Sequence, residues 1–193
     1  MRFPDRLRLP LDFDSVALRR DLEVLASTAW VAHFIRDNYE GDWSVLPLRA
    51  PAGETHPIRM IYSDPTATVF VDTPYLEACP TFRAVLDAFG CEIRAARLMR
   101  LTPGSVIKEH SDHDLDAEEG MARLHIPVTT NPDVEFKVNG RPVVMAPGQT
   151  WYLRLADPHS VANRGTTERT HLVLDVVADA WLLALMDAAL AVA

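Results

Sequence analysis

Short alternating segments separated by turn pairs constrain the fold of this chain more than any other feature of its sequence. Apolar and polar residues alternate over Ile93 to Leu101, and the chain beyond is divided into short runs. Pairs of turn-forming residues separate these runs: Pro103-Gly104, Asn131-Pro132, Asn139-Gly140 and Pro147-Gly148. A period of two is typical of strands, and Asn-Gly favours a two-residue hairpin turn, here between Val134 to Val138 and Pro142 to Met145. About eight short strands with a turn about every 8 to 12 residues predict a sandwich or barrel with helices packed outside it.

Helical periodicity precedes these strands and follows them. Leucines three and four residues apart predict a helix at about 15–28, capped by Asp14 or Ser15. The same spacing of apolar residues predicts a second helix that ends at Gly90, and the apolar stretch from Trp181 predicts a third. We expect a single domain over 1–193, made of three parts: a support region of helices and strands at 1–90, a barrel core at 91–177 and a C-terminal helix at 178–193.

Composition and charge exclude several functional classes. The chain has 27 acidic and 19 basic side chains, a net charge of −8, so nucleic acid is not an expected partner. Its two cysteines, Cys79 and Cys91, form no CxxC pair, which excludes a thiolate zinc site and a disulfide framework. No signal-peptide pattern opens the sequence, and the apolar stretch from Trp181 is interrupted by Asp187 and is too short for a membrane span. We expect a cytoplasmic protein whose last helix packs on the domain or forms a homodimer contact.

Histidines indicate a metal site. His110 and Asp112 are two residues apart, so on a strand they face the same way and can present a nitrogen and an oxygen to one ion. His159 follows a strand expected at Thr150 to Leu155 and is the natural third ligand. Two histidines and one carboxylate on one face of an octahedral ion are typical of non-haem Fe(II) oxygenases, so the pattern favours iron over zinc.

The same segment permits simpler interpretations. The residues from Glu109 to Asp114 can form a solvated loop, because a His-x-Asp pair is short enough to occur by chance. A calcium loop fails on detail, since Ala117 and Arg123 stand where its glycine and its glutamate are expected. His113 is expected to point away from the two ligands if the segment is extended, which makes it a neighbour of the site.

Two expected strands repeat an Arg-x-His pattern, Arg123-Leu124-His125 and Arg169-Thr170-His171. In each, the arginine and the histidine share one face, while aliphatic residues occupy the other: Leu124, Ile126, Val128, Leu172, Leu174 and Val176. On a surface strand the arginine stems would lie along the protein with their charges in water. Beside a metal site, a buried guanidinium needs an anionic partner, and its planar fork suits a carboxylate. The pattern therefore predicts a pocket that binds carboxylates.

Several motifs recur in a fixed order from about Arg97 to Val177: Thr102-Pro103-Gly104, His110-Ser111-Asp112, Arg123 to Val128, Pro147-Gly148, His159 to Asn163, and Arg169 with Asp175. In this order they resemble the 2-oxoglutarate and Fe(II)-dependent aspartyl/asparaginyl β-hydroxylase family, whose bacterial members include hydroxylases of free amino acids. With Tyr39 to Trp43, the resemblance extends over nearly the whole chain. It implies a mainly β fold with flanking helices, the double-stranded β-helix, which is a jelly-roll or cupin-like barrel.

The resemblance also implies roles for individual residues. The two histidines and the aspartate named above would hold Fe(II), and no catalytic residue is expected beyond this metal centre. Arg169, ten residues beyond the distal histidine, would pair with the distal carboxylate of 2-oxoglutarate, and His125 would contact the carboxylate next to the keto group. Arg123 would bind the carboxylate of the substrate. Met99 stands where studied relatives have a serine that helps to hold the co-substrate, and Asp112 stands where those relatives have no carboxylate.

The expected activity is hydroxylation of an amino acid, or of an aspartyl or asparaginyl-type residue in a peptide, with O2 and 2-oxoglutarate as co-substrates. The acidic insertion from Asp114 to Gly120 is a candidate lid. A cupin-like metal enzyme that does not use 2-oxoglutarate is one alternative, but it leaves Arg123 and Arg169 without a common explanation. A non-catalytic jelly-roll binding module, associating through the tail from Trp181, is the other.

Overall fold

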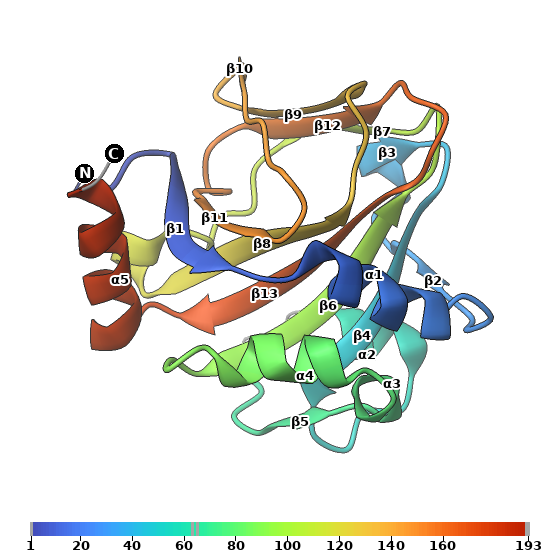
Figure 1. Cartoon of the computed structure of the whole chain (residues 1–193), viewed down its shortest axis with the longest axis horizontal. Helices are drawn as coiled ribbons and strands as arrows, with labels where there is room; N and C mark the ends of the chain where they lie inside the picture. The colour runs from blue at the N-terminus through green and yellow to red at the C-terminus, as the bar shows by residue number, and fades with distance from the viewer. Residues whose placement is uncertain (1, 63, 65, 192–193) are drawn as a thin grey trace.

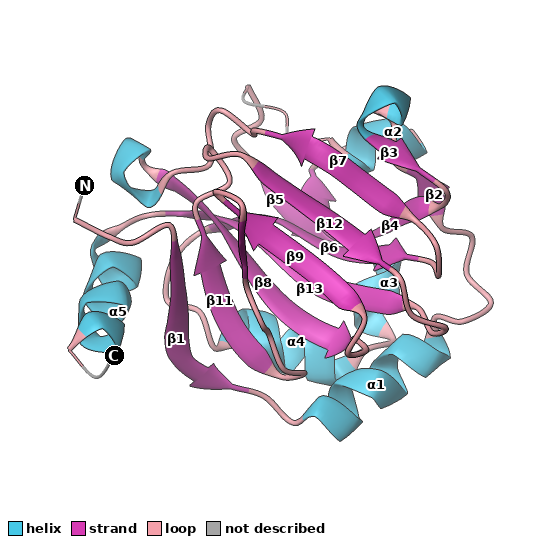
Figure 2. Ribbon diagram, turned by 90° about the horizontal axis from the view of Figure 1, so that it is seen from above, coloured by secondary structure: helices cyan, strands magenta, loops and turns pink. Residues whose placement is uncertain are grey.

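The computed structural model describes residues 2–62, 64 and 66–191, which fold into two facing sheets and several helices (Figure 1). In spatial order the larger sheet contains β1 (Arg6–Asp12), β11 (Gln149–Leu153), β8 (Met121–Thr129), β13 (Arg169–Val177), β6 (Ile93–Leu101), β4 (Trp43–Pro51) and β2 (Val31–Ala32), with β5 (Phe70–Asp72) paired to β4. The smaller sheet contains β10 (Arg141–Pro142), β9 (Val134–Val138), β12 (His159–Asn163), β7 (Val106–His110) and β3 (Tyr39–Glu40). Figure 2 shows the smaller sheet lying over the larger one.

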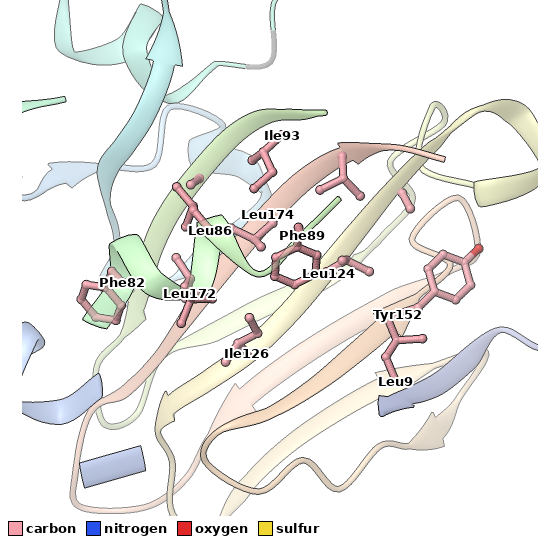
Figure 3. Packing of buried hydrophobic residues seen from close by; sticks show 14 of the residues in the cluster. Leu9, Phe82, Leu86, Phe89, Ile93, Leu124, Ile126, Tyr152, Leu172 and Leu174 are labelled. Carbon is pink, nitrogen blue, oxygen red and sulfur yellow. The ribbon is translucent and has the colours of Figure 1, made fainter. Parts of the chain in front are cut away.

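Helices cover the outer face of the larger sheet. They are α1 (Ser15–Val24), α3 (Pro74–Glu77), α4 (Pro80–Asp87) and α5 (Ala180–Leu190). The short helix α2 (Pro57–Ile61) instead places Ile61 in the apolar cluster between the sheets. Two 3-10 turns, η1 (Arg36–Asn38) and η2 (Ala117–Glu119), complete the described elements. Figure 3 shows side chains of α4 and of the loop after it packed over the outer face of β8 and β13. The aliphatic residues predicted for this face, Leu124, Ile126, Val128, Leu172, Leu174 and Val176, are all buried in this core, which confirms the predicted division of the strands into two faces.

A second apolar cluster fills the space between the sheets. It draws on both sheets and includes Trp43, Met99, Phe136, Val161 and Val173. The mainly β architecture with flanking helices is thus confirmed, but strand pairing does not close the two sheets into the barrel that was expected. Where the edge strands β1 and β10 approach each other, the Arg6 side chain joins them instead, donating to the carbonyl oxygens of Arg141 and Pro142 at 3.0 and 3.1 Å.

Predicted and observed elements agree closely where periodicity is strong. The strand at Ile93–Leu101 has the predicted bounds, and Asn139 and Gly140 adopt positive φ of 50° and 69° in the hairpin between β9 and β10. The first helix ends at Val24 and continues to Thr28 only as turns. No helix among the described residues is long and apolar enough to cross a membrane. The cytoplasmic location and the division into one domain of three parts stay predictions.

The C-terminal helix α5 uses its apolar residues within the chain. Asp179 caps it by accepting hydrogen bonds from the N–H groups of Trp181 and Leu182. Leu182 and Met186 are buried in the core on the outer face of the larger sheet, and α5 lies beside β1 (Figure 1). Packing within the chain therefore explains the apolar residues of this helix, and the homodimer contact stays a prediction.

Gly148 connects the larger sheet to the chain before α1. Its φ is +84°, its N–H donates to the carbonyl of Pro127 and its own carbonyl accepts from the N–H of Phe13, both at 2.9 Å. An added Cβ would overlap the carbonyl oxygen of Phe13. Gly140 has a similar φ of +69°, but a Cβ there would meet no atom within 4 Å.

We therefore expect Gly148→Ala to destabilise the fold more than Gly140→Ala. The backbone conformation should lower the free energy of unfolding by about 1–2 kcal/mol in either variant, because L-residues disfavour positive φ. The steric overlap should add about 1–3 kcal/mol at Gly148 only. Urea unfolding of both variants measures the difference, and equal losses would show that the Phe13 contact does not require the glycine.

Candidate metal centre and its two pockets

The structure brings His110, Asp112 and His159 together. His110 ends β7, His159 begins β12, and the two are direct partners in the register of these strands. One ligand atom from each of the three residues lies within 4.8 Å of the others. Asp112 follows the end of β7 and its N–H donates to the carbonyl of Leu155 at 2.8 Å. The carboxylate therefore reaches the site from a turn, not from the strand that the sequence predicted.

Backbone carbonyl groups orient both histidine rings. Nδ1 of His110 lies 2.7 Å from the carbonyl oxygen of Lys108, and Nδ1 of His159 lies 3.0 Å from that of Asp157. A carbonyl can only accept, so each Nδ1 carries a proton and Nε2 is the ring atom left for a metal. Burial also holds the pKa of His159 below its ordinary value. Two such imidazoles and a carboxylate form a donor set suited to a divalent transition metal.

Arg123 of β8 links the candidate ligand Asp112 to Asp175 of β13. Its Nη1 donates to Oδ2 of Asp112 at 2.8 Å, while its Nε and Nη2 donate to the two oxygens of Asp175 at 2.6 and 3.0 Å. Arg97 of β6 donates to Oδ2 of Asp175 at 2.8 Å. Burial disfavours the charge on Arg123, but Asp175 and Asp112 outweigh burial and raise its pKa. Each nitrogen of this guanidinium is thus on a carboxylate of the protein, and substrate binding by Arg123 stays a prediction.

A narrow pocket, called here the inner pocket, is lined by the three candidate ligands and by Arg169 of β13. Arg169 is 2% exposed, and its Nη2 donates to Nδ1 of His171 at 2.8 Å. Its guanidinium lies 5.7 Å from the ring centroid of Phe136. Among the described residues no carboxylate pairs with it, and burial lowers its pKa to about 9. The structure therefore buries a cation beside the pocket with only a neutral partner.

Three residues that line the inner pocket have a buried side-chain nitrogen without a hydrogen-bond partner in the described part of the chain: Nε1 of Trp43, Nε2 of His125 and Nε of Arg169. An unsatisfied buried polar group costs about 1–3 kcal/mol, so native proteins rarely keep one without a use. The tryptophan and arginine nitrogens are donors, which suits an anionic ligand. Nδ1 of His125 lies 3.4 Å from Nδ1 of His171, and burial together with Arg169 lowers the pKa of both histidines well below the usual value.

A larger cavity of about 270 Å³, called here the outer cavity, meets the inner pocket at the candidate metal ligands. Both are lined by Trp43, Met99, His110, Asp112 and Arg123. His33 lines the outer cavity and stacks on Trp43, with ring centroids 3.6 Å apart and an interplanar angle of 8°. Burial, with Arg123 and Arg97, lowers the pKa of His33 to about 3, so this ring is neutral.

Some site residues were predicted from the sequence and others were not. The structure brings together His110, Asp112 and His159, and it places Arg123, Arg169 and His125 on the inner pocket. His113 and Asp114 line the outer cavity, outside the candidate triad. The repeated Arg-x-His pattern placed His171 on the same strand face as Arg169, and the structure shows it accepting a hydrogen bond from that arginine. Arg97 and His33 are site residues that the patterns did not predict, and His33 stands in an irregular segment to which no periodicity applies.

The chain is similar in sequence to one protein family and to curated hydroxylases. The family model described as Aspartyl/Asparaginyl beta-hydroxylase matches residues 14–179. L-proline cis-4-hydroxylase of Rhizobium meliloti (strain 1021) is 28% identical over 172 residues, which cover 88% of this chain and 59% of that protein. L-proline cis-3-hydroxylase 1 of a Streptomyces species is 25% identical with the same coverage. The chain thus spans about 59% of the length of these curated relatives.

Solved structures share the fold. A 2OG-Fe(II) oxygenase family oxidoreductase from Burkholderia pseudomallei has a TM-score of 0.55 and 22% identity, covering 91% of this chain and 86% of that one. A Pseudomonas putida prolyl-4-hydroxylase has a TM-score of 0.55 and 14% identity, covering 90% and 92%. These likenesses confirm the double-stranded β-helix class as the fold. The match of the family model to residues 14–179 shows that the chain belongs to the aspartyl/asparaginyl β-hydroxylase family.

Proposed function

We propose that this chain is an Fe(II)- and 2-oxoglutarate-dependent hydroxylase of a free amino acid, with L-proline or a related cyclic imino acid as the substrate. The observation that carries the proposal is the inner pocket, which is lined by a His-Asp-His cluster and by a buried arginine that has no carboxylate partner in the described part of the chain. The relatives named as L-proline hydroxylases favour proline over an aspartyl or asparaginyl residue.

The metal would be held by Nε2 of His110, Nε2 of His159 and one oxygen of Asp112. Two nitrogen donors and one oxygen donor on one face fit Fe(II) and leave coordination positions open. When bound, iron and 2-oxoglutarate supply the oxidative chemistry, in which decarboxylation to succinate and CO2 is coupled to insertion of an oxygen atom from O2 into a substrate C–H bond. The protein contributes two imidazoles whose Nδ1 atoms are held by backbone carbonyls, which leaves both Nε2 atoms for the metal.

The co-substrate would lie in the inner pocket with its distal carboxylate on Arg169 and its other carboxylate near His125. A carboxylate there would give Arg169 an ionic partner and raise its lowered pKa again. The inner pocket has only about 30 Å³ of free volume, so a five-carbon ligand requires side chains to move. Met99 lines the pocket, and its unbranched side chain with three rotatable bonds is suited to this movement.

The substrate would occupy the outer cavity, which adjoins the same metal ligands. Its wall combines the cations Arg97 and Arg123 with the anions Asp112 and Asp114, so both charges of a zwitterionic amino acid have a counterpart. Aromatic side chains complete the wall and exclude water from the apolar part of a substrate: His33, Phe34, Trp43 and Tyr62. Arg123, with Arg97 behind it, stays the proposed contact for the substrate carboxylate, which would share that guanidinium with Asp112 and Asp175.

A panel of amino acids tests the reaction. We expect L-proline or another cyclic imino acid to raise succinate formation from 2-oxoglutarate above the rate without substrate, while aspartate, asparagine and a proline-containing peptide do not. Succinate by chromatography and product mass are the readouts. Bound metal without affinity for 2-oxoglutarate would favour a cupin-like enzyme, and absence of stoichiometric metal would favour a binding module.

Alanine substitution tests the three ligands separately. His110→Ala, Asp112→Ala and His159→Ala should each abolish substrate-dependent succinate formation, because two donors hold a divalent ion weakly in competition with water. Calorimetric titration with Mn(II) should show the matching loss of metal affinity. His113→Ala is the matched control from the same segment and should bind Mn(II) like the wild type. Full turnover in any of the three variants would remove that residue from the ligand set.

Arg169→Lys tests the co-substrate subsite. Lysine keeps the charge but loses the planar fork, and one hydrogen bond to a charged group is worth about 1.5–3 kcal/mol. We therefore expect the KM for 2-oxoglutarate to rise about 10- to 100-fold with unchanged Mn(II) affinity. Arg164→Lys, an exposed arginine nearby in sequence, is the control. An unchanged dependence on 2-oxoglutarate in Arg169→Lys would exclude Arg169 from this role.

A further inference from the structure

Four charged side chains form a continuous series of ion pairs beside the candidate metal centre, in the order Arg97, Asp175, Arg123, Asp112. Arg97 and Asp175 are 1% and 3% exposed. Asp175 is the direct register partner of Arg123 across β13 and β8, and it also accepts from Arg97 on the other neighbouring strand, β6. The side chain of Asp175 thus joins three adjacent strands of the larger sheet.

Arg123 divides its guanidinium between two carboxylates in an unequal way. Its Nε and Nη2 form a two-point contact with Asp175 at 2.6 and 3.0 Å, and only Nη1 reaches Asp112, at 2.8 Å from Oδ2. The other oxygen of Asp112, Oδ1, lies 3.8 Å from Nε2 of His110. Asp112 therefore turns one oxygen to the arginine and the other to the nitrogens of the candidate metal ligands.

We infer that Asp175 is a positioning residue for the metal centre, which holds Arg123 by two nitrogens and so prevents that guanidinium from taking both oxygens of Asp112. The inference rests on the proposed iron site. Asp175 acts through Arg123, which contacts both Asp175 and the candidate ligand Asp112. Its contribution is to keep Oδ1 of Asp112 available as a donor atom.

The physical reason lies in competition for Asp112. An arginine and a carboxylate prefer a two-point contact with parallel hydrogen bonds. The structure pairs Arg123 with two carboxylates, Asp112 and Asp175. Without the charge of Asp175, Asp112 is the carboxylate of this pair that remains. Arg97 and Arg123 would also repel each other with no anion between them, which moves Arg123 toward Asp112. A two-point contact with Arg123 would occupy the oxygen that the metal needs.

Asp175→Asn tests this inference, since it removes the charge and keeps the shape. We expect the Kd for Mn(II), measured by calorimetry on the full chain, to rise about 10- to 100-fold, as is usual when a partner of a metal ligand is removed. The matched control is Asp72→Asn. Asp72 likewise bridges two arginines, Arg49 at 2.6 Å and Arg83 at 2.9 Å, but it lines neither the inner pocket nor the outer cavity. It should retain the wild-type Kd.

A double variant separates positioning from loss of structure. Asp175→Asn with Arg123→Gln removes the competing guanidinium, so Mn(II) affinity should recover to within about threefold of the wild type, whereas a merely structural defect would not be rescued. If Asp175→Asn does not fold, Arg123→Lys and Arg123→Gln carry the test. Arg123→Lys keeps a charge near Asp112 but loses the two-point contact with Asp175, so this variant should bind Mn(II) more weakly than Arg123→Gln.

The outcomes distinguish the inference from the function on which it rests. Failure of the wild type to bind Mn(II) would overturn the proposed metal site itself. Three results would overturn the role of Asp175 and leave the metal site in place, provided that the wild type binds Mn(II). They are an unchanged Kd in folded Asp175→Asn, absence of rescue in the double variant, and equal Kd values for Arg123→Lys and Arg123→Gln.

Discussion

Burial of opposite charges between the two sheets is the constraint on which the rest of the site depends. Moving an ion out of water costs several kcal/mol, and an ion pair offsets this cost only when its geometry is good and its remaining donors are satisfied. Asp175 pairs with Arg97 on one neighbouring strand and with Arg123 on the other, and Arg123 extends the pairing to Asp112. The position of the candidate metal ligand is therefore set by charges fixed in the middle of a sheet, although Asp112 itself lies in a turn.

Charged side chains can be buried between the sheets because the strands of the larger sheet present different residues on their two faces. In β8 and β13, alternate residues from Ala122 to Val128 and from Leu172 to Val176 are aliphatic and pack under the helices (Figure 3). The arginines and histidines of these strands lie at the intervening positions. A register slip of one residue would exchange these faces and place the charges in the apolar core. The helices α1 and α4 are thus part of the reason for the site, since their apolar cover on the outer face stabilises a sheet whose inner face carries charged side chains beside apolar ones.

Local patterns predicted most of what is local in this structure. The period of two located β6, the Asn-Gly pair located the hairpin at Asn139, and residue spacing brought out His110 and Asp112. The pairing of Asp175 with two arginines depends on the strand order β6-β13-β8, which no local signal contains. Two further features depend in the same way on contacts between distant parts of the chain. They are the open sheet edges in place of a closed barrel and the contribution of His33 from an irregular segment.

The two buried arginines on the inner pocket differ in what remains for a ligand. The nitrogens of Arg123 are all on carboxylates and its pKa is raised, so an incoming anion would compete with pairs that already exist. Arg169 donates to a neutral histidine, and its Nε has no hydrogen-bond partner among the described residues. Burial lowers its pKa to about 9. An anion bound there would therefore offset the cost of burying this charge. Burial also keeps His125 and His171 neutral, and Arg169 then contributes a single positive charge to this group of three. A single carboxylate is the charge that matches it, which is why the distal end of a dicarboxylic keto acid suits this position better than the more highly charged phosphate does.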